Sequence, residues 1–353
     1  IQGALTTGML FVTPSPTSTD AAEMICKRFK IDQIRFTNSG TESTMYAVRV
    51  ARSASDKMGI LKVEGGYHGS YDPFVVSAKP PLDKAGDPEE PTAVMDSNLV
   101  PGDIYVVPYN NAPALEAMFE KNASKIACFI VEPVLENLAI ILPDAGYLER
   151  VRELCDEYNV ILIFDEVKTG LTAGAHGASV RLGVEPDLIT LAKSIGGGVP
   201  LAAFGGKKKY MDFVTNGKMA HFGTFNGNPL AMAGVRAIDR LCSDQALADA
   251  EALNQQALDR ISEIIDEYQL PAHTVGFGVK GCVTWSTTPV RNYRDYKATD
   301  FGIAEAHWLF ALNRGIITPP GLDEQWLISL AHGQTEIDLL VEDFREFAKA
   351  LRA

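Results

Sequence analysis

Residues 160–170 read VILIFDEVKTG, and residues 187–200 read DLITLAKSIGGGVP. Each stretch is a short apolar run that ends in a charged residue, which is Asp165 in the first and Lys193 in the second. Their separation fits one strand–helix–strand unit. In open α/β sheets, ligands bind outside the carboxyl ends of the strands, so we expect Asp165 and Lys193 to face one site.

Similar apolar, β-branched runs recur through the first part of the chain and alternate with helix-like stretches. This alternation predicts an α/β fold with a mainly parallel sheet sandwiched by helices. Several runs are apolar without a period of two, as expected for strands that are covered on both faces. The expected strands span 34–37, 60–63, 104–107, 126–131, 160–164, 188–191 and 201–204.

After Gly227 the pattern changes to long helical segments, a β-rich stretch over 275–286 and further helices. We therefore predict a large cofactor-binding domain over residues 1–245 and a smaller C-terminal α+β domain over 246–353. A strand is expected near Ile316 in the second domain. In the first domain, Asp20 with Glu23 indicates the start of a helix, because this spacing is typical of a capping box.

Composition limits the classes of partner. Hydrophobic residues make up 46% of the chain and charged residues 22%, which is typical of a globular protein. The net charge of −13 argues against binding to nucleic acid, whose phosphates attract Lys and Arg. No apolar run has the length of a membrane span, and no targeting signal follows Ile1. We expect a cytoplasmic protein that binds neither membranes nor nucleic acid.

Two small-residue turns are candidates for binding an anion. Ser39, Gly40 and Thr41 lie between an expected strand and a helix, where backbone N–H groups and two hydroxyls can meet a phosphate. An ordinary helix N-cap explains the same residues. In the stretch HFGTFNGNP at 221–229, Thr224 again precedes a helix, either as a second phosphate contact or in a plain loop.

The stretch GGYHG at 65–69 follows the expected strand 60–63. Its glycines allow the backbone to come close to a ligand, and Tyr67 has a ring that can stack on a flat heterocycle. Packing within the loop is the alternative for Tyr67. His68 is either a partner of Asp165 or an unrelated loop histidine, and the sequence leaves both open.

Lys193 has the chemistry of a covalent carrier. An ε-amine that is partly desolvated has a lowered pKa, so its neutral form can attack a carbonyl group. A solvated lysine at a strand end is the alternative. A nucleophilic lysine, a carboxylate, a phosphate site and a stacking ring together describe a site for pyridoxal phosphate. Asp165 would then keep the ring nitrogen protonated, and the released amine of Lys193 would act as a general base.

Two other classes of enzyme are disfavoured. The stretch GFGVKG at 276–281 matches the dinucleotide fingerprint, but Cys282–Trp285 continues as a strand where that fingerprint requires a helix. The six histidines show no H-x-x-x-H pair, and the five cysteines form no C-x-x-C pair, so we expect no metal site. A non-catalytic homologue, in which Lys193 stays free, is the remaining alternative from a different class.

Several motifs occur together and in a fixed order. The chain resembles the class III pyridoxal-phosphate-dependent aminotransferases of fold type I. The matching stretches are NSGTE at 38–42, GGYHG at 65–69, VEP at 131–133, IFDEVKTG at 163–170, LAKSIGGGVP at 191–200 and GTFNGNPLAMAG at 223–234.

This resemblance implies roles for the residues around the cofactor ring. Lys193 corresponds to the Schiff-base lysine, and Asp165 to the partner of the pyridine nitrogen. Tyr67 corresponds to the residue stacked on one ring face, and Val167 to the residue on the other. Glu132 corresponds to a member of the polar network near the ring.

The resemblance also implies how the phosphate is held. Ser39, Gly40 and Thr41 correspond to the phosphate-binding turn, and Thr224 to a residue that reaches the phosphate from the neighbouring subunit. A homodimer follows from that shared site. His68 is included among the expected cofactor-binding residues.

Within the family, three stretches resemble the glutamate-1-semialdehyde aminomutase branch: LPDAGYLE at 142–149, IGGGVPLAAFGG at 195–206 and SLAH at 329–332. Lys168 departs from that branch, which usually has an apolar residue there, and the family's N-terminal segment has no counterpart. We expect an aminotransferase that moves an amino group from an amino acid, such as a β- or aromatic one, to a keto acid. The aminomutase reaction itself is the alternative within the family.

Overall fold

The computed structural model describes residues 2–11, 13–95, 102–319 and 325–352. The chain forms two compact units. The first unit comprises Ile1–Pro133, Pro143–Leu171 and His176–Leu241, and the second comprises Val134–Leu142, Thr172–Ala175 and Cys242–Ala353. The two-domain boundary expected at residues 245 and 246 stays a prediction.

A seven-stranded sheet with the order β1-β7-β6-β5-β4-β2-β3 forms the centre of the first unit. Every strand pair is parallel except the two pairs made by β7, so the predicted mainly parallel sheet is confirmed. The strands are β1 (Gln33–Thr37), β2 (Gly59–Val63), β3 (Ile104–Val107), β4 (Ile126–Val131), β5 (Ile161–Glu166), β6 (Leu188–Leu191) and β7 (Ala202–Gly206).

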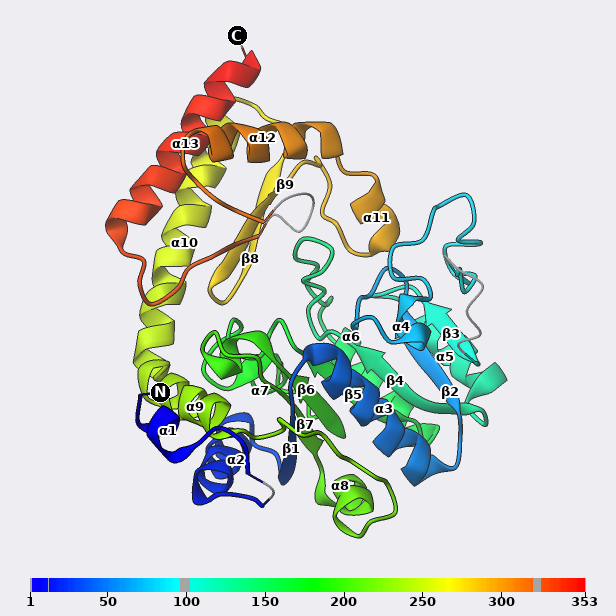
Figure 1. The fold of residues 1–353 in the computed structure, drawn as a ribbon. Coiled ribbons are helices and arrows are strands. Elements are labelled where there is room, and N and C mark those ends of the chain that lie inside the picture. Colours follow the sequence, from blue (N-terminus) through cyan, green and yellow to red (C-terminus); the bar gives the residue numbers. More distant parts are fainter. Residues whose placement is uncertain (1, 12, 96–101, 320–324, 353) are drawn as a thin grey trace. The chain divides into compact units, whose positions relative to one another are not determined.

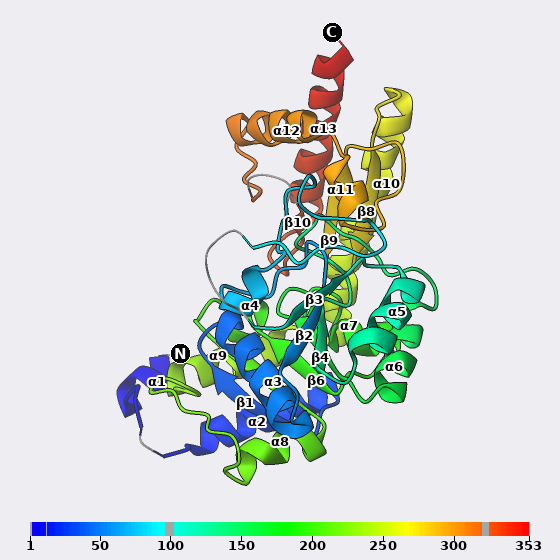
Figure 2. The same cartoon turned by 90° about the vertical axis from the view of Figure 1, so that its right-hand side faces the viewer.

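Helices pack on both faces of this sheet (Figures 1 and 2). Helices α3 (Gly40–Ser55) and α8 (Lys208–Thr215) contribute to one apolar cluster, and α2 (Pro16–Phe29) and α9 (Pro229–Leu241) contribute to another. The remaining helices of this unit are α1 (Gln2–Thr7), α4 (Asp72–Val75), α5 (Ala112–Asn122), α6 (Tyr147–Glu157), α7 (Gly177–Leu182) and the single 3₁₀ turn η1 (Lys193–Gly196).

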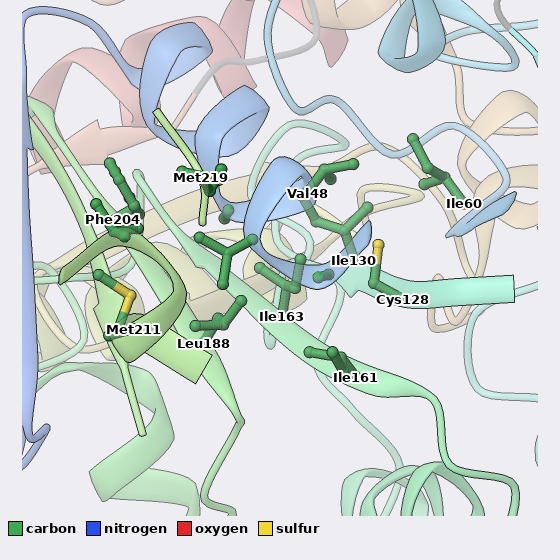
Figure 3. Close-up of a cluster of buried hydrophobic side chains, with 14 of the residues drawn as sticks. Val48, Ile60, Cys128, Ile130, Ile161, Ile163, Leu188, Phe204, Met211 and Met219 are labelled. Carbon is green, nitrogen blue, oxygen red and sulfur yellow. The ribbon is translucent and has the colours of Figure 1, made fainter. Parts of the chain in front are cut away.

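The cluster under α3 shows how the strands alternate. Ile161 and Ile163 of β5 pack in this cluster with Ile130 of β4 and Val48 of α3 (Figure 3). Alternate residues of a strand point to the same face, so the next position of β5 on this face is Asp165. The apolar rows that hold α3 therefore continue into polar side chains at the carboxyl ends of the strands.

Local capping fixes where helices α2 and α3 begin. Ser39 caps α3, and its hydroxyl accepts a hydrogen bond from the backbone N–H of Glu42, which contributes about 1 kcal/mol. Helix α2 begins at Pro16 behind a capping box formed by Ser15 and Ser18. The start predicted at Asp20 was therefore wrong, because proline at the first helical position favours the earlier start.

The second unit has a three-stranded antiparallel sheet with the order β10-β9-β8. Strands β8 (His273–Phe277) and β9 (Lys280–Thr284) form a hairpin through Gly278, whose φ is +60°, so the dinucleotide interpretation was rightly rejected. Ile316 lies outside any strand, and the strand expected there was wrong. The other elements are β10 (Trp326–Leu327), α10 (Asp244–Glu267), α11 (Tyr293–Lys297), α12 (Phe301–Asn313) and α13 (Gln334–Arg352).

Helix length and polarity bear on membrane insertion. Within the described residues, none of the helices combines the length and the apolar character that a membrane span requires.

Helix α9 packs closely against the turn that contains Lys193. A Cβ added at Gly234 of α9 would lie only 2.4 Å from the carbonyl oxygen of Gly196 in η1. The contact is with backbone, which cannot rotate away as a flexible side chain can. Glycine at position 234 is therefore required for the approach of α9 to η1.

We predict that Gly234→Ala destabilises the protein by about 1–3 kcal/mol, because the added methyl group overpacks a buried contact. Urea unfolding measures this change. Gly302→Ala in α12 is the matched control, since its added Cβ would meet nothing closer than the Asp300 carboxylate at 3.4 Å. The control should change the free energy of unfolding by less than about 1 kcal/mol. Equal effects of the two substitutions would contradict the packing argument.

Candidate active site

Strands β1, β2, β5 and β6 run in the same direction, and the turns that follow them carry most of the predicted site residues. Ser39–Thr41 follow β1, Tyr67 and His68 follow β2, Val167 follows β5, and Lys193 follows β6. Since the carboxyl ends of parallel strands meet at one edge of a sheet, the topology brings these turns together. All of them belong to the first unit.

Asp165 is a buried carboxylate, only 3% exposed, with three hydrogen-bond donors. Thr190 Oγ1 of β6 donates to Oδ1 at 2.9 Å, and the backbone N–H of Val167 donates to the same oxygen at 3.1 Å. His68 Nδ1 lies 2.7 Å from Oδ2. A buried carboxylate is costly unless such donors compensate for lost water. The donors come from β6, from the turn after β5 and from the loop after β2, so Asp165 holds these three segments together.

The contact with Asp165 places a proton on Nδ1 of His68, and burial favours the neutral form of the ring. A carboxylate only accepts hydrogen bonds, so Nδ1 must be the donor toward Asp165. Nε2 is buried without a hydrogen-bond partner among the described residues, and a proton there would be an unsatisfied donor. Burial lowers the pKa of His68 below its ordinary value, although the hydrogen bond to Asp165 opposes this shift. The partnership of His68 with Asp165, which the sequence left open, is therefore present.

A row of polar side chains extends along the sheet from Asp165. By strand alternation, Lys62 of β2 and Thr190 of β6 lie on the same face of the sheet as Asp165. Glu132 comes directly after β4 and continues the alternation of that strand on this face. Lys62, Glu132 and Thr190 are all buried. Glu132, which the resemblance placed in a polar network, thus lies in phase with a buried lysine, and its role near the cofactor stays a prediction.

Close packing at two glycines draws the turns together. A Cβ added at Gly40 would lie 3.1 Å from Val167 Cγ1 and 3.6 Å from the Cβ of Ala192, the residue before Lys193. A Cβ added at Gly69, where φ is +101°, would lie 2.4 Å from Thr41 Oγ1. The N-terminus of α3 is thus in contact with the loop after β2 and with the ends of β5 and β6.

Lys193 stands in a left-handed backbone conformation with φ of +51°. This region is unfavourable for lysine, and such strain occurs often at functional sites. The residue is exposed in the single chain, so this chain does not itself supply the burial that we expected to lower the pKa of the amine. The strained turn nevertheless fixes where the side chain leaves the backbone.

Tyr67 and Thr224 are both exposed in the single chain. Tyr67 is 42% exposed, which leaves its ring available for stacking. Thr224 lies in a loop whose neighbours Phe222 and Phe225 are 83% and 59% exposed. The same loop is tied to the turn between β1 and α3, because Asn38 Nδ2 donates to Asn226 Oδ1 at 2.8 Å. The phosphate role of Thr224 and its contribution across a dimer interface stay predictions.

These residues fit pyridoxal phosphate. A carboxylate has about four lone-pair sites, so Asp165 can accept one more hydrogen bond, such as one from a pyridinium N–H. The first turn of α3 offers backbone N–H groups and the Ser39 and Thr41 hydroxyls to a phosphate. Lys193, an exposed residue, supplies an amine at the same sheet edge. The donor set thus matches the ring nitrogen, the phosphate and the aldehyde of the cofactor.

Three buried residues escaped the sequence-based prediction. Thr190 fixes Asp165, and Lys62 places a cation within the polar row. Glu166 accepts hydrogen bonds from the backbone N–H groups of Ala178 and Ser179 at 2.6 and 2.9 Å, which anchors the start of α7. Lys62 could have been noticed in the sequence, because it is a charged residue within an apolar strand. The sequence around Thr190 contains no comparable signal.

Fold and site together define an enzyme with pyridoxal-phosphate chemistry on a fold type I scaffold. The aminotransferase class-III family model matches residues 2–304. The chain belongs to the class III aminotransferase family, whose members are pyridoxal-phosphate-dependent enzymes. The predicted family, fold class, enzyme class and cofactor are thereby confirmed.

Individual relatives support two branches of this family. The chain is 36% identical over 345 residues to a glutamate-1-semialdehyde 2,1-aminomutase from Francisella philomiragia, covering 96% of this chain and 78% of the relative. It superposes on an omega-transaminase from Sphaerobacter thermophilus with a TM-score of 0.93 at 30% identity, covering 100% of this chain and 82% of that one. For a β-phenylalanine aminotransferase from Variovorax paradoxus the TM-score is 0.86 at 28% identity, with coverage of 99% and 77%.

The neutral state of buried His68 predicts a pH dependence of folding. Its pKa in the folded chain is below the ordinary 6.5, so in acid the unfolded chain binds this proton more readily. The free energy of unfolding should therefore fall as pH decreases from about 6.5 toward the lowered folded value. His68→Gln cannot titrate and should show a shallower decline in urea unfolding across this range. His332→Gln, at an exposed loop histidine, is the control and should follow the wild type. A slope unchanged by His68→Gln would refute the assignment.

Proposed function

We propose that this protein is an aminotransferase that moves an amino group from an amino acid to a keto acid, with β-amino and aromatic acids as favoured donors. The observation that carries the proposal is the convergence of Lys193, the Asp165–His68 pair and the N-terminus of α3 at one sheet edge. Bound pyridoxal phosphate supplies an aldehyde that accepts the amino group and a ring that withdraws electrons from the substrate carbon. Likeness to a β-phenylalanine aminotransferase and an omega-transaminase supports the donor class.

Lys193 has two roles in this proposal. Its Nζ would hold the cofactor covalently until an amino substrate takes its place. The released amine would then act as the general base at the amine-bearing carbon of the substrate. The strained turn suits both roles, because it holds the base of the side chain in one place.

Asp165 pairs as an anion with the protonated ring nitrogen. Thr190, Val167 N–H and His68 already hold its two oxygens in place, so little reorganisation is needed when the cofactor binds. Neutral His68 leaves the negative charge on Asp165. Tyr67 and Val167 would contact the two ring faces, and Glu132 would contribute to the polar surroundings of the ring.

Ser39, Gly40 and Thr41 hold the phosphate at the start of α3, where the helix dipole favours an anion. Thr224 reaches the phosphate from the second subunit of a homodimer. The exposure of Phe222 and Phe225 beside Thr224 supports this arrangement, because large apolar side chains at one surface often mark an interface.

The aminomutase reaction is the second candidate, and the 36% identity to an enzyme of that name favours it. The two reactions differ in their products. An aminotransferase releases a keto acid from the donor and needs a second substrate, whereas the aminomutase moves the amino group between carbons 2 and 1 of glutamate-1-semialdehyde. Product analysis with a panel of β-amino and aromatic donors, and with glutamate-1-semialdehyde, decides between them.

We predict that Lys193→Ala folds normally but lacks the visible absorption band that the wild type develops with pyridoxal phosphate. Its turnover should fall by about 10²- to 10⁴-fold, because the general base is lost. Lys168→Ala removes another lysine that follows β5 and should keep the band. Normal turnover of Lys193→Ala, or loss of the band in both variants, would contradict the assignment of Lys193.

We predict that Asp165→Asn still binds pyridoxal phosphate but reacts about 10²-fold more slowly, because the ring nitrogen loses its charged partner. Single-turnover kinetics with an amino donor measures this step. The control is Glu166→Gln, which changes the adjacent carboxylate that bonds to α7. It should lower the melting temperature and leave the rate per bound cofactor closer to that of the wild type. Equal rates in Asp165→Asn and the wild type would exclude the proposed role.

A further inference from the structure

Lys62 of β2 is a lysine with no solvent exposure. Lysine is rarely buried unless its ammonium group is paired or hydrogen-bonded. Here Nζ donates to the carbonyl oxygens of Phe74 at 2.9 Å and Val76 at 2.7 Å. These carbonyls lie at the end of α4, where a cation offsets the partial negative charge of helix carbonyls.

The two contacts of Lys62 close the loop that follows its own strand. We call residues 64–77 the β2 loop. Its beginning is fixed by the backbone N–H of Glu64, which donates to Val107, and by that of Gly65, which donates to the carbonyl of Ser77 at 2.8 Å. Lys62 fixes the returning part at Phe74 and Val76. The β2 loop carries Tyr67 and His68 between these fixed ends.

Lys62 also acts on this region through its charge. Burial lowers the pKa of Lys62 to about 7, and the Glu132 carboxylate opposes this shift. The charge of Lys62 contributes to lowering the pKa of His68. An ammonium group at this position therefore favours the neutral imidazole that donates to Asp165.

We propose that Lys62 is a positioning residue for the cofactor site: its buried Nζ holds the end of the β2 loop through two hydrogen bonds and thereby sets the places of Tyr67 and His68. The inference rests on the proposed function, because it concerns the two residues of that loop that meet the cofactor. Lys62 acts through the loop and does not itself touch the cofactor.

Lys57 offers a matched control. Its Nζ also donates to two carbonyl oxygens, those of Ala123 at 2.8 Å and Asn159 at 3.2 Å. These carbonyls belong to segments that follow α5 and α6, outside the β2 loop. Lys57→Met therefore removes the same kind of contact without touching the loop.

Hydrogen exchange of the full-length apoprotein tests the first half of the proposal. Lys62→Met should raise backbone exchange within residues 64–77 by about tenfold or more, and leave β4 at the wild-type rate. Lys57→Met should leave the β2 loop unchanged. If Lys62→Met is too unstable to purify, Lys62→Gln provides the same comparison, because its shorter amide cannot reach both carbonyls. An unchanged β2 loop, or an equal increase in Lys57→Met, would overturn the proposal.

Calorimetric titration with pyridoxamine phosphate tests the second half. This probe carries an amine in place of the aldehyde, so its affinity does not depend on covalent attachment to Lys193. Lys62→Met should bind it about tenfold more weakly than Lys57→Met and the wild type, a loss of about 1.4 kcal/mol. Equal affinities would leave Lys62 as a residue of folding alone and overturn its positioning role. If the wild type binds no pyridoxamine phosphate, the proposed function fails, whereas hydrogen exchange still decides whether Lys62 holds the loop.

Discussion

The hydrogen bond between His68 and Asp165 is the interaction on which the rest of the site depends. It joins the loop after β2 to the end of β5 at a distance of 2.7 Å, with both side chains buried. Inside a protein, an unpaired carboxylate costs several kcal/mol more than a paired one. Asp165 therefore requires its donors, and the donors require the strand order that places β2, β5 and β6 together. The histidine tautomer follows from the same bond.

Backbone contacts at glycines set how closely the elements around this bond can approach. Gly40, Gly69 and Gly234 lie where an added methyl group would meet Val167, Thr41 or the backbone of η1. Side chains at these positions would separate α3, the β2 loop and α9 from the strand ends. The site is thus shaped by the absence of side chains as much as by the catalytic groups. Lys62 and Glu132 are buried polar residues on the same face of the sheet as Asp165.

Much of the architecture could be predicted because its signals are local. The runs at 126–131 and 188–191 form β4 and β6 with the expected bounds. Local signals also misled: the Asp20 and Glu23 spacing suggested a helix start, whereas Ser15 and Pro16 begin α2 earlier. Competing caps a few residues apart differ by a few tenths of a kcal/mol to about 2 kcal/mol, so the neighbours of a cap decide its use.

The sequence by itself determined the strands of the seven-stranded sheet and the turns whose small and charged residues point to cofactor chemistry. It did so because propensity, periodicity and capping act over a few neighbouring residues. Only the tertiary structure decided which of these residues meet. His68 and Asp165 are 97 positions apart, and Thr190 reaches Asp165 from the adjacent strand. Such contacts depend on strand order and register, and a slip of one residue would turn each side chain to the opposite face of the sheet.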